Sequence, residues 1–387
     1  MTRPAISAAE KFEQNYRQNL KLSGSIGLDV LDYGYRFGGR TLLTLMVAIT
    51  ATFMSSYAFL FGLYQADMLK VMDVIPFFMI IFQGVMEAMK RMLNPTKYRV
   101  LLEKSKRLFE HLNQNEGNSK ELYDALQYTL TLQRLLVYWY SIIYVIVISI
   151  TFAISFVGEK QLPMPLLLPG IDESSTTGFI LLTAIDLVQM IVGNRGYITF
   201  DSHFLFMVFP ISGYVNAIEN EINTLNSMLN AVTRDQKAIS AQFLRIFSLH
   251  QMLDEFEISF ENEWAMSNLM KIGSAILGLV SCLSLVFVGG SVRTYLTLGL
   301  FFTQMTQYCL MGTIITVKNE HLVKALYTIE WYLLHHREAK HLVLMLQRAQ
   351  NAPCATIGGI APLDVETYVQ IMKTIYSFVM AMITFME

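Results

Sequence analysis

The chain has 387 residues, of which 53% are hydrophobic and only 16% charged, and its formal net charge is −2. Soluble domains carry about 25% charged residues, whereas apolar stretches long enough to cross a bilayer recur along this whole chain. The composition therefore excludes a soluble globular protein and predicts one integral membrane domain that is all α-helical. The three cysteines, Cys282, Cys309 and Cys354, do not make a secreted disulfide framework or a metal cluster.

Seven apolar stretches have the length of a transmembrane helix. At about 1.5 Å of rise per residue, the apolar core of a bilayer needs roughly 20 residues. The expected spans are residues 41–63, 74–89, 135–156, 178–215, 270–288, 294–316 and 368–386.

The fourth stretch, 178–215, is too long for an ordinary span and contains Asp186, Arg195 and Asp201. A break at Gly193–Gly196 would give two short spans and an eight-span protein. We instead expect one long helix that projects beyond the membrane, because the distribution of basic residues favours seven spans.

Basic residues concentrate in cytosolic loops of membrane proteins. Seven spans with a cytosolic N-terminus leave only Lys70, Lys160 and Arg293 in outer segments, whereas eight spans would move the basic residues of 317–362 outside. The sequence therefore predicts a cytosolic N-terminus and an extracellular C-terminus. This orientation is the inverse of that of a G-protein-coupled receptor.

Four regions follow from this topology. Residues 1–40 form an amphipathic, partly helical cytosolic segment, and residues 41–316 hold six transmembrane helices with cytosolic extensions, among them an amphipathic pair at 216–264. Residues 317–361 form a cytosolic anchor helix, expected to be continuous from 317 to 350, and then a turn. Residues 362–387 form the terminal transmembrane helix.

The terminal helix carries one polar stripe. Asp364 has the position and chemistry of a helix N-cap. Small or polar residues then recur at helical spacing and share one face: Gln370, Thr374, Ser377, Ala381 and Thr384. Such a stripe either packs against another helix in lipid or faces water in a pore.

The sequence contains no motif of a known catalytic site, and we expect no enzyme, cofactor or metal. His335, His336 and His341 lie in an amphipathic segment where solvated or packed histidines are the rule. Asp186 and Arg195 are more informative, since ionisable groups at membrane depth are costly and often functional. Alternatively, Asp186 faces a polar cavity and Arg195 extends to the membrane surface. Asp201 is expected to cap or to pair at the cytosolic boundary.

Aromatic residues and methionines recur in the outer halves of several spans. With 23 Met and 25 Phe in the chain, they suit an adaptable apolar cavity with few polar groups, although each set alone is also typical of bundle core. The candidate lining residues are Val74, Phe77, Phe78, Ser149, Phe152, Phe156, Ile185, Gln189, Met190, Tyr295 and Phe302.

The C-terminal third resembles the insect odorant receptors. The resemblance rests on LYTIEWYLLHHREAKHLVLMLQRAQNAP (326–353) and GGIAPLDVETYVQIMKTIYSFVMAM (358–382). They contain a Trp-Tyr pair, an RAQ turn followed by a proline, and the IxKxxYS pattern. LPMPLLLPGID (162–172) and DSHFLF (201–206) are weaker matches. The chain lacks the large insertion of the family's co-receptor, so it resembles the odour-tuning subunit.

The resemblance implies an odorant-gated, non-selective cation channel in the dendritic plasma membrane of olfactory sensory neurons. The expected partners are the co-receptor in a heterotetramer, a small volatile odorant, membrane lipid and permeating cations, but no nucleic acid. Ser377, Ala381, Thr384 and Phe385 would line the pore and its gate. Apolar faces on the cytosolic segments need another subunit, and the expected contacts are Trp331, Tyr332 and Leu334.

Two other classes share some of these features. A gustatory receptor would have the same fold with a different C-terminal pattern, and a transporter would show internal inverted repeats. Neither pattern is evident in the sequence.

Overall fold

The structure is a computed structural model that describes residues 7–29, 31–32, 34–157 and 162–386, without the side chains of 151–152, 154–157, 383 and 385–386. The α-helices are α1 (Ala8–Ile26), α2 (Gly39–Tyr64), α3 (Met68–Leu93), α4 (Pro95–Asn113), α5 (Ser119–Val157), α6 (Thr176–Leu229), α7 (Gln236–Val288), α8 (Val292–Tyr327), α9 (His336–Ala349) and α10 (Val365–Met386). Two 3-10 turns, η1 (Glu116–Asn118) and η2 (Trp331–Leu333), and two short strands, β1 (Thr356–Ile357) and β2 (Ala361–Pro362), complete the described elements.

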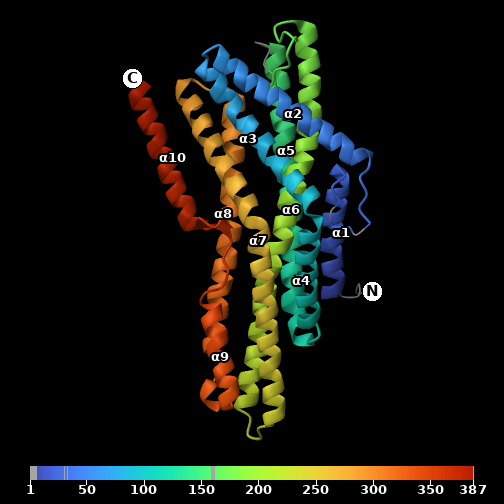
Figure 1. Ribbon diagram of the computed structural model, residues 1–387, viewed down its shortest axis with the longest axis vertical. Helices are drawn as coiled ribbons and strands as arrows, with labels where there is room; N and C mark the ends of the chain where they lie inside the picture. The colour runs from blue at the N-terminus through green and yellow to red at the C-terminus, as the bar shows by residue number, and fades with distance from the viewer. Residues whose placement is uncertain (1–6, 30, 33, 158–161, 387) are drawn as a thin grey trace.

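The helices form one elongated bundle. Figure 1 shows α6 and α7 running along most of its length, with the turn between them at the lower end. Helices α2, α3 and α5 lie in the upper part, α9 lies in the lower part, and α10 runs up one edge to the C-terminus. Within the bundle α5 packs on α6, α3 on α7 and α2, and α8 on α6 and α7.

The predicted all-α membrane fold is confirmed. Among the described residues, five helices are long and apolar enough to cross a membrane: α2, α3, α5, α6 and α7. The two remaining predicted spans lie in α8 and α10, which are not among these five. Helix α8 is 36 residues long, but Thr303, Gln304, Thr306 and Gln307 make its middle polar.

Residues 178–215 belong to one continuous helix, as predicted. Helix α6 has 54 residues and passes through Gly193, Gly196 and Pro210 without a break. The alternative of two short spans is therefore wrong.

Helix α3 begins earlier than the sequence indicated. It begins at Met68 rather than after Asp73, capped by Asp67, whose Oδ1 accepts from the backbone N of Lys70 at 3.2 Å. Asp73 lies inside the helix, where its carboxylate forms an ion pair with Arg293 of α8. Because Arg293 compensates the charge of Asp73, this residue is accommodated inside the helix rather than before its start.

The expected continuous helix over 317–350 is also wrong. Helix α8 ends at Tyr327, a 3-10 turn covers Trp331–Leu333, and α9 begins at His336. His335 is the N-cap of α9, and its backbone N donates to Glu338 Oε2 at 3.1 Å. The HHRE stretch is therefore a capping box that starts a new helix rather than the middle of an old one.

A buried aromatic cluster lies where α3, α4, α6, α7 and α8 meet. The ring of Phe204 lies 5.0 Å from Trp264 and 4.8 Å from Tyr308, and Trp264 meets Tyr98 edge-on at 6.0 Å. All four residues are 1% exposed or less. The guanidinium of Arg91 lies over the Tyr98 ring at 4.9 Å and is itself buried.

A buried polar network lies beside this cluster. Asp201 accepts from Lys271 Nζ at 2.7 Å, from the Tyr308 hydroxyl at 2.5 Å and from the Tyr140 hydroxyl at 3.1 Å. The expectation that Asp201 caps or pairs is confirmed, and its partners come from α5, α7 and α8.

The chain reaches α10 through a β-hairpin that is fastened to α7. Gly358 N donates to Ala265 O at 3.1 Å, and Thr356 N donates to Glu261 Oε2 at 3.0 Å. The segment then crosses α8 at Gly312, where a Cβ would lie 1.7 Å from Leu363 O. Asp364 caps α10 as predicted, accepting from Thr367 N at 2.7 Å.

A buried carboxyl group at the junction of α7 and α8 makes stability depend on pH. Glu257 is 4% exposed and lies in the part of α7 predicted to be outside the membrane. Burial raises its pKa from 4.5 to about 8; a hydrogen bond from Asn319 opposes this rise and the charge of Asp254 adds to it. The stability gained from the protonated form is complete below the unfolded pKa and lost as pH rises through the folded pKa.

We expect Glu257→Gln, which stays neutral, to flatten this dependence. Between about pH 5 and pH 9, the melting temperature of the native protein in detergent should fall more than that of the variant, by at least about 2 °C. Glu255→Gln, a change at an exposed site two residues away, is the control. Parallel curves for the native protein and Glu257→Gln would contradict the prediction.

Candidate ligand-binding cavity

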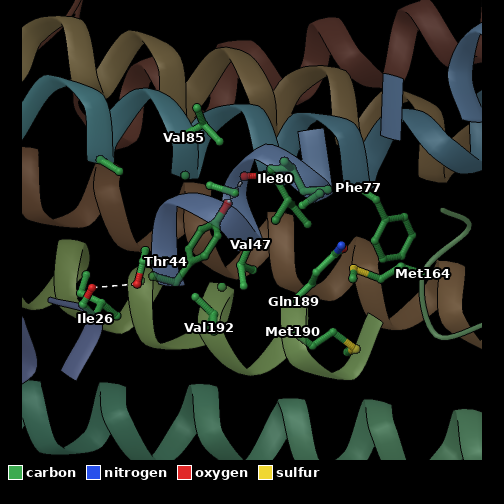
Figure 2. Close-up of a pocket in the computed structure, with 18 of the residues that line it drawn as sticks. Ile26, Thr44, Val47, Phe77, Ile80, Val85, Met164, Gln189, Met190 and Val192 are labelled. Atoms are coloured by element: carbon green, nitrogen blue, oxygen red, sulfur yellow. Dashed lines mark hydrogen bonds between the residues drawn. The ribbon is translucent and has the colours of Figure 1, made fainter. Parts of the chain in front are cut away.

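The upper part of the bundle contains an apolar cavity of about 140 Å³. Helices α2, α3, α5, α6 and α8 surround it, and the loop before α6 adds Met164 (Figure 2). The lining residues are Ile26, Leu28, Thr44, Val47, Ala48, Ala51, Phe77, Ile80, Ile81, Gly84, Val85, Ala88, Tyr144, Val147, Met164, Gln189, Met190, Val192, Gly193, Gly196, Tyr197, Phe200, Thr297 and Leu300.

Small side chains at helical spacing leave the space open. On α2, Thr44, Val47, Ala48 and Ala51 follow the i, i+3, i+4, i+7 pattern of a single helix face. Helix α3 contributes a similar stripe from Phe77 to Ala88. The cavity is thus a consequence of residue size on faces that otherwise resemble ordinary packing surfaces.

Glycines extend this open wall on α3 and α6. A Cβ added at Gly84 or Gly193 would meet no other heavy atom within 4 Å. The Gly193–Gly196 pair, which suggested a helix break in the sequence, instead lines the cavity within an intact helix.

Several polar side chains in the wall are already hydrogen-bonded to the backbone. The Thr44 hydroxyl donates to Ile26 O at 2.7 Å, as Figure 2 shows, and the Tyr197 hydroxyl donates to Ile80 O at 3.2 Å. Gln189 differs, since its Nε2 is 3.3 Å from the sulfur of Met54. The surface offered to a ligand is therefore almost wholly apolar.

The loop at 162–175 closes the upper end and lacks helix, as its prolines predicted. Met164 N donates to Asp186 Oδ2 at 3.1 Å, and Arg293 Nη1 donates to Leu162 O at 2.7 Å. Asp186 therefore fastens the loop, and Arg195 is exposed on the other side of α6. A second, more polar cavity of about 460 Å³, lined in part by Leu162 and Arg293, lies beyond the loop.

The cavity brings together three of the lining residues predicted from sequence: Phe77, Gln189 and Met190. Val74 is buried but lines the second cavity, and Ile185 packs in the apolar cluster next to Met190.

The other predicted lining residues lie elsewhere, insofar as the structure describes them. Phe78 stacks on Phe59 at 6.0 Å, and Ser149 and Tyr295 are exposed. Phe302 is exposed as well and meets Tyr368 of α10 at 6.1 Å. The side chains of Phe152 and Phe156 lie outside the described set.

The predicted lining set omitted α2 altogether. Most of its members were aromatic, whereas α2 contributes small residues to the wall. The signal that was available is the Thr44-to-Ala51 stripe on a helix that carries no charged residue after Arg40.

On α10 the polar stripe points away from the rest of the chain. Ser377, Ala381 and Thr384 are exposed, whereas Ile375 and Val379 are each 2% exposed and pack against the bundle. Among the described residues, the stripe is therefore not covered by another helix of this chain. The side chain of Phe385 lies outside the described residues.

The predicted subunit contacts lie at the junction of α8 and α9. Trp331 is 62% and Tyr332 65% exposed, and their rings meet edge-on at 6.0 Å. Leu334 is half-buried against the core.

Long apolar helices around an apolar cavity define a multi-pass membrane protein. Residues 67–376 match the family model described as 7tm Odorant receptor, so the chain belongs to that family. This assignment favours the odorant over the gustatory alternative.

Relatives in two flies agree with this assignment. The chain is 22% identical over 241 residues to putative odorant receptor 83c of Drosophila melanogaster, covering 58% of this chain and 60% of the relative. It is 19% identical over 230 residues to odorant receptor 10 of Aedes albopictus, with the same coverage. The matched region thus spans less than two thirds of these relatives.

A solved structure has the same fold. The insect olfactory receptor OR5 from Machilis hrabei, in complex with eugenol, superposes with a TM-score of 0.75 at 13% identity, covering 96% of this chain and 99% of that one. A second structure of the same receptor superposes with a TM-score of 0.72 at 12% identity, covering 96% of this chain and 98% of that one.

We expect Gly84→Leu to reduce the cavity volume without disturbing the fold, because nothing lies within 4 Å of the added Cβ. Ligands that fill the cavity should lose at least about tenfold in potency, and the smallest ligands should lose least. Potency is measured as the concentration for half-maximal response. Gly299→Leu adds the same side chain in open space on α8, away from the cavity, and is the matched control. Equal effects of the two variants would contradict the assignment of this cavity.

Proposed function

We propose that this chain is an odour-tuning subunit of a non-selective cation channel gated by a small apolar volatile. The observation that carries the proposal is the apolar cavity of about 140 Å³ in a member of the odorant receptor family. An engineered apolar cavity of about 150 Å³ holds benzene, so this space suits a molecule of one ring or a short chain. The eugenol complex of the Machilis hrabei receptor supports a ligand of this kind.

The proposed orientation places the N-terminus, α4 and α9 in the cytosol and the end of α10 outside the cell. The excess of Lys and Arg in the lower segments supports it. The proposed location is the dendritic plasma membrane of olfactory sensory neurons.

The exposed stripe of α10 supports a pore. Ser377, Ala381 and Thr384 are polar or small and lack a partner surface in this chain, whereas the opposite face is anchored by Ile375 and Val379. A helix held on one side and polar on the other suits the wall of a water-filled channel formed with other subunits. In this proposal Phe385 lies beside the gate.

The exposed aromatic pair supports assembly with the co-receptor. Trp331, Tyr332 and Tyr327 are all more than 60% exposed, and Val343 and Leu344 on α9 add apolar area. Large exposed patches of this kind mark protein interfaces. In the proposed heterotetramer this region meets a neighbouring subunit.

We expect a cysteine placed at Thr384 to react with a charged thiol reagent from outside and to block the current. Cells expressing Thr384→Cys with the co-receptor would be tested against a panel of volatiles, and block should be several-fold faster while an activating volatile is present. Val379→Cys, on the buried face of the same helix, is the matched control and should not be blocked. Reaction at Thr384→Cys without change in current would refute a pore at this face.

We expect Trp331→Ala to lower recovery of the heteromer while leaving the monomer folded, since the ring makes its only described ring contact with Tyr332. Truncating a central aromatic at an interface costs about 2 kcal/mol or more, which corresponds to roughly thirtyfold in affinity. Co-purification with the co-receptor is the measurement, and Tyr64→Ala, an exposed aromatic at the upper end, is the control. Equal recovery of both variants would place the interface elsewhere.

A further inference from the structure

Gln189 is the polar residue that is best placed to select the ligand. It lies on α6, is 6% exposed, and extends into the upper end of the cavity toward Phe77 and Met164 (Figure 2). Its helix neighbour Met190 lines the same wall, so the amide is surrounded by apolar groups.

The hydrogen-bonding capacity of this amide is largely unused. Its Nε2 faces the Met54 sulfur at 3.3 Å, and a thioether is a weak acceptor. Its Oε1 is buried and has no hydrogen-bond partner among the residues that the structure describes. Buried amide oxygens are normally paired, and an unpaired one costs free energy that a ligand can recover.

Three hydroxyl groups of the wall already use their protons in hydrogen bonds. Thr44, Tyr197 and Thr297 each donate to a backbone carbonyl, at 2.7, 3.2 and 2.9 Å. Within the described wall, Gln189 Oε1 is the buried side-chain oxygen that lacks a partner. A ligand O–H that reaches this atom therefore recovers the free energy of an unmade hydrogen bond.

Building on the proposed odorant function, we propose that Gln189 determines specificity for small neutral alcohols and phenols. The ligand O–H donates to Gln189 Oε1, and its hydrocarbon body contacts Phe77, Met190 and Ile80. A methyl ether has no O–H to donate, so it leaves Oε1 unpaired, as does a ketone. A charged ligand is excluded because nothing in the described wall compensates for its desolvation.

The test compares matched ligands on matched variants in cells expressing the full chain with the co-receptor. The probes are phenol, benzyl alcohol and hexanol, each with its methyl ether. Acetophenone is a further ligand that accepts hydrogen bonds but has no O–H to donate. On the native chain each alcohol should be about tenfold more potent than its ether. Gln189→Met keeps the side-chain length and removes both polar atoms, so this preference should disappear through loss of potency for the alcohol alone.

Two further variants separate hydrogen bonding from shape. Met190→Leu changes the neighbouring wall residue and should shift alcohol and ether equally. Met54→Leu removes the thioether and should leave the alcohol preference intact, because the contact to the ligand is made by Oε1. Ligand-induced change in melting temperature of the purified heteromer gives a binding readout that does not depend on gating.

The outcomes distinguish this inference from the proposed function. If volatiles open the channel but alcohols have no advantage over their ethers, or keep it in Gln189→Met, the specificity role of Gln189 is wrong and the proposed function stands. If no volatile in a broad panel changes either current or melting temperature, both are wrong.

Discussion

The pairing of Asp201 with Lys271 is the constraint on which the bundle depends. Both side chains are almost fully buried, their charged atoms are 2.7 Å apart, and each is also within reach of the Tyr308 hydroxyl. Removing one partner of a buried pair leaves an uncompensated charge and costs about 3–5 kcal/mol. Because the partners come from α5, α6, α7 and α8, only one relative placement of these helices satisfies all of them. The pair thereby specifies which faces meet.

Below and above this network the bundle is packed in different ways. Below it, Phe204, Phe260 and Trp264 fill the space between helices with rings in contact. Above it, small residues and glycines leave a cavity between the helices. Close packing resists changes of shape. The side chains around an apolar void lack van der Waals contacts on one side, and a bound ligand can supply them. The candidate ligand cavity accordingly lies in the half that contains this void.

Periodicity made the helices predictable, and contacts distant in sequence decided the rest. The single long α6, the cap at Asp364 and the non-helical loop at 162–175 all follow from local patterns. The start of α3 was misplaced because the partner of Asp73 lies 220 residues away. The cavity was predicted only in part because its α2 wall consists of small residues. Their size creates a cavity only when the neighbouring helices are packed around them. Tyr295 is of a residue type that is common in pockets, but its position on the helix turns its side chain outward, where it is exposed.

Helix α8 contacts both the cavity and the helix that is proposed to line the pore. Thr297 and Leu300 line the cavity, and two residues further along the same helix Phe302 contacts Tyr368 of α10, whose hydroxyl also accepts from Thr306 at 3.1 Å. Helix α7 contacts α10 as well but contributes no residue to the cavity wall. Coupling requires an element whose position both sites influence, and among the described helices α8 meets that condition. In the proposed channel, a ligand that fills the space beside Leu300 acts on α10 through a rotation or shift of α8, with the Phe302–Tyr368 contact as the point of transfer.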